Sequence, residues 1–241
     1  MTSKNARRLK VEIWSDLTCP WCWLGIRRFE RALEQFEHAG AVEVIRRAYR
    51  LEPGQTSPVP VDAMLVDKYG LSPQQVAASL QEIERTGATE GLVYRFDGAL
   101  SGDTLDGHRL IKLAATVGLQ REVAERFFRG YFSEHVSLFD RTSLLRLAIE
   151  AGLDETDVSR VLSGDAYRAE VEADQQRAQM LGIRGVPFFL LGERYGISGA
   201  QPPEAIADGL KQAWVALPDE NVFAADASLS CGQEGCAIPR G

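Results

Sequence analysis

The chain has 241 residues, enough for one large domain or two small ones, and 45% of them are hydrophobic, the ordinary share for a folded globular protein. Its formal net charge of −7 and isoelectric point near 5.1 leave no basic surface for a phosphate backbone, which argues against nucleic-acid binding. No apolar run approaches the roughly 18 residues of a membrane helix, and the first residues lack the apolar core of a signal peptide. We therefore expect a cytoplasmic protein that does not bind membranes.

The first predicted elements form a strand–helix–strand unit. Residues 9–15 place Val11 and Ile13 on one face, an alternation that is typical of a strand. From Pro20 onward, apolar side chains recur at helical intervals, and a second strand is expected at 42–50. A unit of this kind favours a parallel pair of strands.

The middle of the chain is predicted to be helical. A loop rich in Pro and Gly at 52–60 precedes helical patterns that continue through residues 61–182. Three glycines stand where the C-terminal caps of these helices are expected, namely Gly118, Gly152 and Gly182. A strand at 186–191, a turn, a second short strand and a last helix at 203–215 complete the pattern.

These elements predict a split α/β domain, made of residues 9–60 and 183–216, that is interrupted by an all-helical insertion at 61–182. Residues 217–241 are rich in Ala, Asp, Ser and Gly, and we expect them to form a flexible tail.

The four cysteines fall into two close pairs. Cys19 and Cys22 lie in T-C-P-W-C-W, and Cys231 and Cys236 lie in S-C-G-Q-E-G-C. Because ordinary cytoplasmic thiols are kept reduced, a structural disulfide framework is not expected. Paired spacing instead indicates redox chemistry or metal binding.

The first pair sits at the predicted start of a helix, with Pro20 at a position where its missing N–H is not needed. The positive end of the helix dipole stabilises a thiolate, so Cys19 is the expected nucleophile, exposed at the helix end. Cys22, one turn deeper, is the expected resolving thiol. A zinc site is the alternative use of two cysteines at this spacing.

Four motifs occur in a family-specific order: S-D-L-T-C-P-W-C-W-L-G at 15–25, T-L-D-G-H-R-L at 104–110, G-I-R-G-V-P-F-F at 182–189 and S-G-A-Q at 198–201. With these motifs the chain resembles the DsbA family of thiol–disulfide oxidoreductases, and specifically its FrnE-like branch, over residues 11–216. The resemblance implies a thioredoxin-like fold that carries the helical insertion.

The resemblance also implies site residues and partners. It assigns the nucleophile to Cys19, the resolving thiol to Cys22 and a cis proline to Pro187, while Val186 offers backbone groups to an extended substrate. The implied partners are proteins or peptides that carry thiols or disulfides, with glutathione as a further candidate, and no cofactor or metal is required. Trp21 is expected to shape an apolar rim for such a substrate.

Other residues near this site have two interpretations each. Asp16 either caps the loop or passes protons for the buried thiol, and His108 either faces the cleft and adjusts the thiolate or only packs. For Trp23 we expect core packing.

The related kappa-class glutathione transferases and hydroxychromene carboxylate isomerases resemble this layout with serine in place of Cys19, so a glutathione-dependent isomerase or transferase is an alternative function.

The second pair, Cys231 and Cys236, is predicted to reduce or reoxidise the first pair by intramolecular exchange, because a tether raises the effective concentration. Half of a zinc site shared between subunits and an inert tail are the other two interpretations. The oligomeric state is left open by the sequence.

Overall fold

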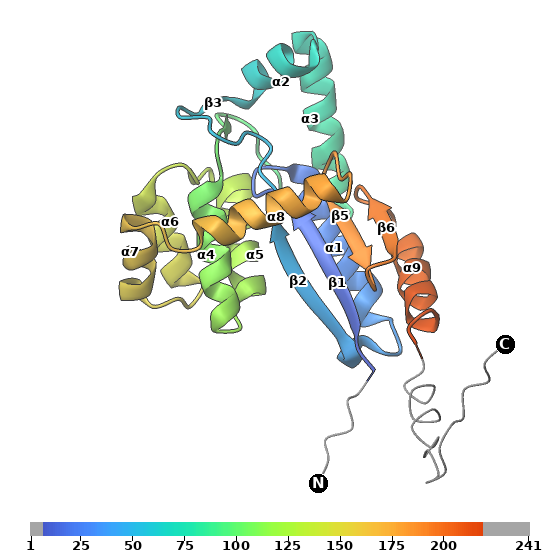
Figure 1. The fold of residues 1–241 in the computed structure, drawn as a ribbon. Helices are drawn as coiled ribbons and strands as arrows, with labels where there is room; N and C mark the ends of the chain where they lie inside the picture. Colours follow the sequence, from blue (N-terminus) through green and yellow to red (C-terminus); the bar gives the residue numbers. More distant parts are fainter. Residues whose placement is uncertain (1–6, 219–241) are drawn as a thin grey trace, which may run out of the picture.

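A mixed sheet forms the centre of the computed structural model, which describes residues 7–218 (Figure 1). Its strands are β1 (Leu9–Ser15), β2 (Val42–Ala48), β5 (Phe188–Leu191) and β6 (Tyr195–Ser198), in the order β2-β1-β5-β6. Strands β1 and β2 run parallel, as the βαβ pattern predicted, and β5 and β6 join antiparallel. The C-terminal end of β1 leads directly to the first cysteine pair.

Two helices cover one face of the sheet. Helix α1 (Pro20–Glu34) packs beside α9 (Pro203–Val215), and both cover the buried side chains that alternate along β1. The rings of Phe29 on α1 and Phe189 on β5 stack with their centroids 5.6 Å apart. This apolar layer fixes the direction of α1 and therefore the place of the cysteines at its start.

Helix α8 (Arg168–Met180) crosses the opposite face of the sheet (Figure 1). The Trp14 indole donates to the backbone carbonyl of Asp174 at 3.0 Å, and the buried Glu12 accepts from Arg47 and Arg177. Burial raises the pKa of Glu12, but the hydrogen bonds from Arg177 and Arg47 outweigh it and hold that pKa below its ordinary value. Helix α8 packs on the sheet although it belongs to the predicted insertion at 61–182. The division of the chain into a split α/β domain and an all-helical insertion stays a prediction.

Four helices gather beside the sheet: α4 (Leu105–Thr116), α5 (Gln120–Glu134), α6 (Arg141–Glu150) and α7 (Glu155–Ser163) (Figure 1). One continuous cluster of buried apolar residues runs from the sheet into these helices. The three predicted caps are confirmed, because Gly118, Gly152 and Gly182 follow the ends of α4, α6 and α8 with φ of +76°, +101° and +71°.

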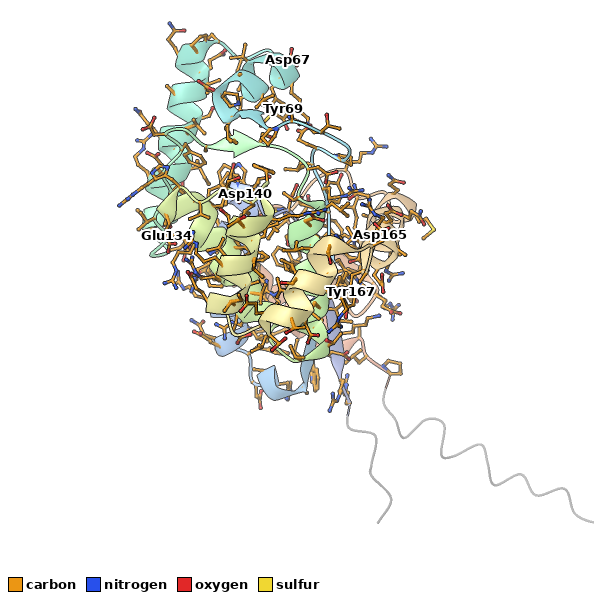
Figure 2. All side chains as sticks on the ribbon, turned by 90° about the vertical axis from the view of Figure 1, so that its left-hand side faces the viewer. Asp67, Tyr69, Glu134, Asp140, Asp165 and Tyr167 are labelled. Carbon is orange, nitrogen blue, oxygen red and sulfur yellow. The ribbon has the colours of Figure 1, made fainter. Side chains whose placement is uncertain are left out.

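Helices α2 (Val61–Tyr69) and α3 (Pro73–Ala88) form an arm above the end of the sheet at which β1 ends (Figure 1). Figure 2 shows Asp67 and Tyr69 on α2 at one end of the molecule, well above Glu134 and Asp140. A two-stranded ribbon of β3 (Val59–Pro60) and β4 (Leu100–Ser101) lies at the base of this α2–α3 arm.

The predicted strand at 42–50 ends earlier, at Ala48, because the backbone N–H of Arg50 donates a hydrogen bond to the side chain of Gln175 on α8 and not to a strand. A short 3₁₀ turn at Ala39–Ala41 joins the segment after α1 to β2. No helix among the described residues combines the length and the apolar character needed to cross a lipid bilayer.

Candidate functional site

The first cysteine pair lies at the start of α1, as predicted. Cys19 is the residue that precedes the helix, with extended backbone angles (φ −90°, ψ 111°), and Pro20 occupies the first helical position. The backbone N–H of Cys22 donates to the carbonyl of Cys19 at 3.0 Å, so the two residues are one turn apart. Both thiols are free. The positive end of the helix dipole therefore points at Cys19.

Cys19 is less exposed than the sequence analysis expected. Only 6% of the residue is accessible, because its thiol lies against the segment before β5 and donates to the carbonyl of Val186 at 3.7 Å. Its remaining access is through a cavity in whose wall it stands. A group that reacts with the sulfur must therefore enter this cavity or its mouth.

Cys22 lies fully buried behind Cys19. Burial, and after it the neighbouring Cys19 thiol, raise the pKa of Cys22 well above its ordinary value, and the charge of Asp16 acts in the same direction. The backbone N–H of Asp16 donates to the Cys22 sulfur at 3.4 Å. Cys22 is thus held as a buried, protonated thiol.

The Val186–Pro187 peptide bond is cis, as predicted, and the Val186 carbonyl lies against the Cys19 thiol. The pyrrolidine ring of Pro187 touches α1 at Gly25. A Cβ atom on Gly25 would lie 2.6 Å from Cγ of Pro187, closer than carbon atoms can approach. Gly25 therefore allows the proline segment to reach the cysteines.

The sequence analysis did not single out Gly25. A signal was present, because a glycine inside a helical pattern costs about 1 kcal/mol relative to alanine and usually has a packing reason. Only the structure identifies that reason as Pro187.

Asp16 ties three segments together at the base of the site. Its buried carboxylate accepts from the backbone N–H of Leu17 at 2.7 Å, from the hydroxyl of Thr104 at 2.6 Å and from the backbone N–H of Leu51 at 2.7 Å. Of the two predicted roles, these contacts support the fixing of the loop. Proton transfer by Asp16 stays a prediction.

His108 lies behind Asp16 and is only 3% exposed. Its Nε2 atom is 3.4 Å from Oδ1 of Asp16, but the two groups are not aligned as a hydrogen bond, and Nε2 has no hydrogen-bond partner among the described residues. His108 faces a small enclosed space beside Ser15 and Lys112 and does not line the cavity at Cys19. The position supports an effect through Asp16 and not the predicted orientation toward the cleft, because the buried His108 does not line the cavity at Cys19.

The two tryptophans of T-C-P-W-C-W point to different surroundings. Trp21 is 44% exposed and lines the cavity beside Cys19, where a rim was predicted. Trp23 is buried, stacks on Phe128 and Phe132 with centroids 6.1 and 5.9 Å away, and donates from its indole N–H to Glu125 at 2.9 Å. The prediction of core packing for Trp23 is confirmed.

The cavity beside Cys19 has a volume of about 340 Å³ and lies between the start of α1 and the α2–α3 arm. A larger hollow of about 660 Å³ lies between α1, the edge strand β2 and the start of α5, and neither cysteine lines it. Of these two hollows, therefore, only the smaller one is lined by a residue of the Cys19–Cys22 pair.

Within residues 7–218 no group of three or more potential metal-binding side chains comes together. Cys231 and Cys236 lie outside the described residues, so the three interpretations of that pair stay predictions.

Comparison with known proteins identifies the family. Residues 10–211 match the DSBA-like thioredoxin domain. The chain belongs to this family. It is also similar to a probable DsbA oxidoreductase from Streptomyces coelicolor, at 41% identity and a TM-score of 0.85, over 97% of this chain and 100% of that one.

Two further solved structures share the fold. A putative protein disulfide isomerase from Nitrosomonas europaea is 22% identical with a TM-score of 0.65, over 86% of this chain and 98% of that one. The cytosolic disulfide reductase DsbM from Pseudomonas aeruginosa, also solved with GSH, is 18% identical with a TM-score of 0.58, over 86% of this chain and 100% of that one. The predicted thioredoxin-like α/β fold with added helices is thus confirmed.

Proposed function

We propose that this DsbA-family protein is a thiol–disulfide oxidoreductase that exchanges disulfides with proteins or peptides through Cys19 and Cys22. The observation that carries the proposal is the asymmetry of the pair. The Cys19 thiol stands in the wall of an open cavity at a helix N-terminus, whereas the Cys22 thiol is buried one turn behind it.

The exchange proceeds in two balanced steps. The Cys19 thiolate attacks one sulfur of a substrate disulfide, the substrate S–S bond breaks, and a mixed disulfide forms at Cys19. The other substrate sulfur leaves as a thiolate and then takes up a proton. Cys22 then gives up its proton and attacks the Cys19 sulfur of the mixed disulfide. The second substrate sulfur leaves as a thiolate that takes up a proton, and the Cys19–Cys22 disulfide forms. The two electrons lost by the protein have then reduced the substrate disulfide to two thiols. The reverse sequence oxidises a substrate dithiol.

The environment of Cys22 suits the second step. Its raised pKa disfavours the thiolate, so the buried thiol does not compete with Cys19 for the incoming substrate. Formation of the mixed disulfide removes the negative charge of Cys19, and with it one of the causes that raise this pKa. Deprotonation of Cys22 is therefore favoured only after a substrate is bound covalently.

The Val186 carbonyl, which accepts from the Cys19 thiol, lies where the backbone of an extended substrate would approach the sulfur. Substrates are thus proteins or peptides with accessible thiols or disulfides, and glutathione is a candidate partner because the related fold of DsbM has been solved with GSH. We place the reaction in the cytoplasm, in keeping with the cytosolic DsbM.

A redox titration in glutathione buffers tests the proposal. In a full-length chain with Cys231→Ser and Cys236→Ser, the remaining thiols are alkylated at each potential and counted by mass. We expect one reversible two-electron transition between roughly −270 and −120 mV, the range of thioredoxin-like pairs. Cys19→Ser is expected to abolish it, and Cys22→Ser is expected to accumulate a mixed disulfide at Cys19. Absence of any disulfide between Cys19 and Cys22 would refute the proposal.

The same variants separate the two alternatives. A glutathione-dependent isomerase or transferase would keep its turnover of a small substrate in Cys22→Ser, because it needs no resolving thiol. A zinc-binding protein would release stoichiometric metal to a chelator before its cysteines could be alkylated.

A further inference from the structure

The larger hollow, beside the edge strand β2, has a volume of about 660 Å³. Helix α1, strand β2, the second half and end of α4 and the start of α5 line it, and we refer to it as the β2 hollow. Among the described residues, none lines both this hollow and the cavity at Cys19. A volume of this size lies within the range of sites that bind small molecules.

Part of the lining of the β2 hollow is apolar. Phe29 and Leu33, one turn apart on α1, contribute to it together with Val44 on β2. Leu33 and Val44 are only partly covered by the rest of the protein. An apolar body that lies against them would therefore remove further apolar surface from water, which is the condition for a favourable hydrophobic contribution.

Three cationic side chains line the same hollow: Arg46, Lys112 and Arg121. The carboxylate of Glu30 lies between the two guanidinium groups, with N···O distances of 3.4 Å to Arg46 and 3.0 Å to Arg121. Lys112 is paired with Asp174, which also serves a further arginine. Besides Glu30, the lining contains one other acidic residue, the exposed Glu34. Three positive charges thus face two negative ones, an excess that matches one added negative charge.

Arg46 is the cation on which an added anion would gain most. Its side chain is only 10% exposed, and among residues 7–218 its guanidinium donates one hydrogen bond, the long contact to Glu30. Burial lowers the pKa of Arg46, and the charge of Glu30 does not make up for it. A second oxyanion at this buried guanidinium would accept a charge-assisted hydrogen bond, which is the stronger kind.

The start of α5 adds backbone donors beside these side chains. Its first residues, Gln120 and Arg121, line the β2 hollow. The residue before the helix, Leu119, has no side-chain oxygen that could accept from the first N–H groups. These N–H groups and the positive end of the helix dipole favour negative charge at the same place as Arg121.

The outer edge of β2 is not free to pair with an extended peptide. The backbone N–H of Arg46 donates to the side chain of Gln120 at 3.3 Å, and that of Ala48 donates to Asp174 at 2.9 Å. Because alternate N–H groups of a strand point to the same side, these two bonds occupy the edge at which a new strand would pair. The geometry therefore favours a compact ligand over a peptide strand.

We propose that the β2 hollow binds a small amphipathic monoanion, whose single oxyanion group contacts Arg46 and whose apolar body lies against Leu33 and Val44. A carboxylate attached to a hydrocarbon or aromatic body has this chemistry, because its oxygens match the planar guanidinium. The inference goes beyond the proposed disulfide exchange and does not depend on it, since the hollow and the cavity at Cys19 share no lining residue.

Two fluorescent probes that differ in charge test the site. Anilinonaphthalene sulfonate (ANS) is an aromatic body with one oxyanion group, and N-phenylnaphthylamine is its neutral counterpart. Fluorescence titration of the reduced full-length chain gives the Kd of each probe. We expect Arg46→Met to weaken the binding of ANS by roughly 10- to 150-fold and to leave the Kd of the neutral probe within about 2-fold.

Two exposed arginines on α5 form a matched pair of variants. Arg121 lines the β2 hollow and has a side chain that is 65% exposed, whereas Arg129 does not line it and is 59% exposed. Arg121→Met is expected to weaken the binding of ANS by about 2- to 5-fold, the effect of an exposed ion pair. Arg129→Met should leave the Kd unchanged, because it removes an equal charge outside the hollow.

A peptide assay separates the β2 hollow from the cavity at Cys19. The full-length chain with Cys22→Ser, Cys231→Ser and Cys236→Ser cannot release an adduct at Cys19, so its reaction with a peptide disulfide is followed by mass. Saturating ANS is expected to leave the rate of this reaction unchanged.

The outcomes separate this inference from the proposed function. The β2 hollow is overturned as an anion site if ANS does not bind, if its Kd is the same in Arg46→Met, or if Arg129→Met weakens it as much as Arg121→Met. Inhibition of the peptide reaction by ANS also overturns it, because the probe then occupies the cavity at Cys19. Failure of the peptide to react at all overturns the proposed function and not this inference. If Arg46→Met does not fold, the pair of variants on α5 still decides.

Discussion

The exchange of Asp16 for asparagine tests how the site is held together. The carboxylate uses both oxygens: Oδ1 accepts from Leu17 and Thr104, and Oδ2 accepts from the backbone of Leu51. Asparagine has one acceptor oxygen and one NH₂ group. If the oxygen keeps its two donors, the NH₂ group faces the N–H of Leu51, and two donors oppose each other.

The magnitude follows from these three contacts. A hydrogen bond to a charged group contributes about 1.5–3 kcal/mol, and a buried donor without an acceptor costs about 1–3 kcal/mol. The Leu51 contact is only partly buried, which favours the lower half of that range. We therefore expect Asp16→Asn to lower the free energy of unfolding by about 3 kcal/mol, or the Tm by roughly 6–12 °C for a domain of this size.

The same substitution should change the chemistry of Cys22 in a separate way. The charge of Asp16 is one of the groups that raise the pKa of Cys22, so its removal is expected to lower that pKa. The assays are thermal unfolding of the reduced protein and titration of thiolate absorbance in a chain whose other cysteines are serine. Thr104→Val is the control, because it removes one hydrogen bond and keeps the charge.

We expect the control to melt between the parent and Asp16→Asn, with the pKa of Cys22 unmoved. The reasoning is refuted if Asp16→Asn melts within about 2 °C of the parent, or if the pKa of Cys22 shifts equally in both variants.

Three other predictions follow from the site. Gly25→Ala places a methyl group against Pro187, so mixed-disulfide formation at the nucleophile should slow by roughly 10- to 100-fold, and an unchanged rate in the peptide assay would contradict the close contact. The pKa of Cys22 is raised in the folded protein and takes its ordinary value of 9.0 in the unfolded chain, so the unfolded chain loses this proton at a lower pH. Above pH 9.0 the reduced protein should therefore lose up to about 1.4 kcal/mol of its free energy of unfolding per pH unit. Urea unfolding at pH 9 to 10 measures this slope, which Cys22→Ala should remove. If Cys231 and Cys236 exchange with the first pair, their joint replacement by serine should slow its reoxidation by oxidised glutathione in a quenched alkylation assay; equal rates would make the tail pair dispensable.

Local signals in the sequence account for much of the architecture. Alternating apolar residues marked β1, the spacing after Pro20 marked α1, and Gly118 marked the end of α4, because periodicity and cap chemistry act over a few residues. The same short-range signals predicted that Cys19 lies at a helix N-terminus and Cys22 one turn further along the helix. The family motifs added the cis bond at Pro187, which the structure contains.

Only the tertiary structure decided how these parts meet. The near-complete burial of Cys19, the contact of Gly25 with Pro187 and the clustering of Asp16 with Thr104 join residues that are tens of positions or more apart in the chain. The cavity beside Cys19 likewise depends on where the α2–α3 arm stands over the end of the sheet. Burial and contact of this kind are set by long-range packing, which periodicity does not encode. The sequence by itself therefore determined that two cysteines stand one turn apart at a helix start, and the tertiary structure decided how far each of them is exposed.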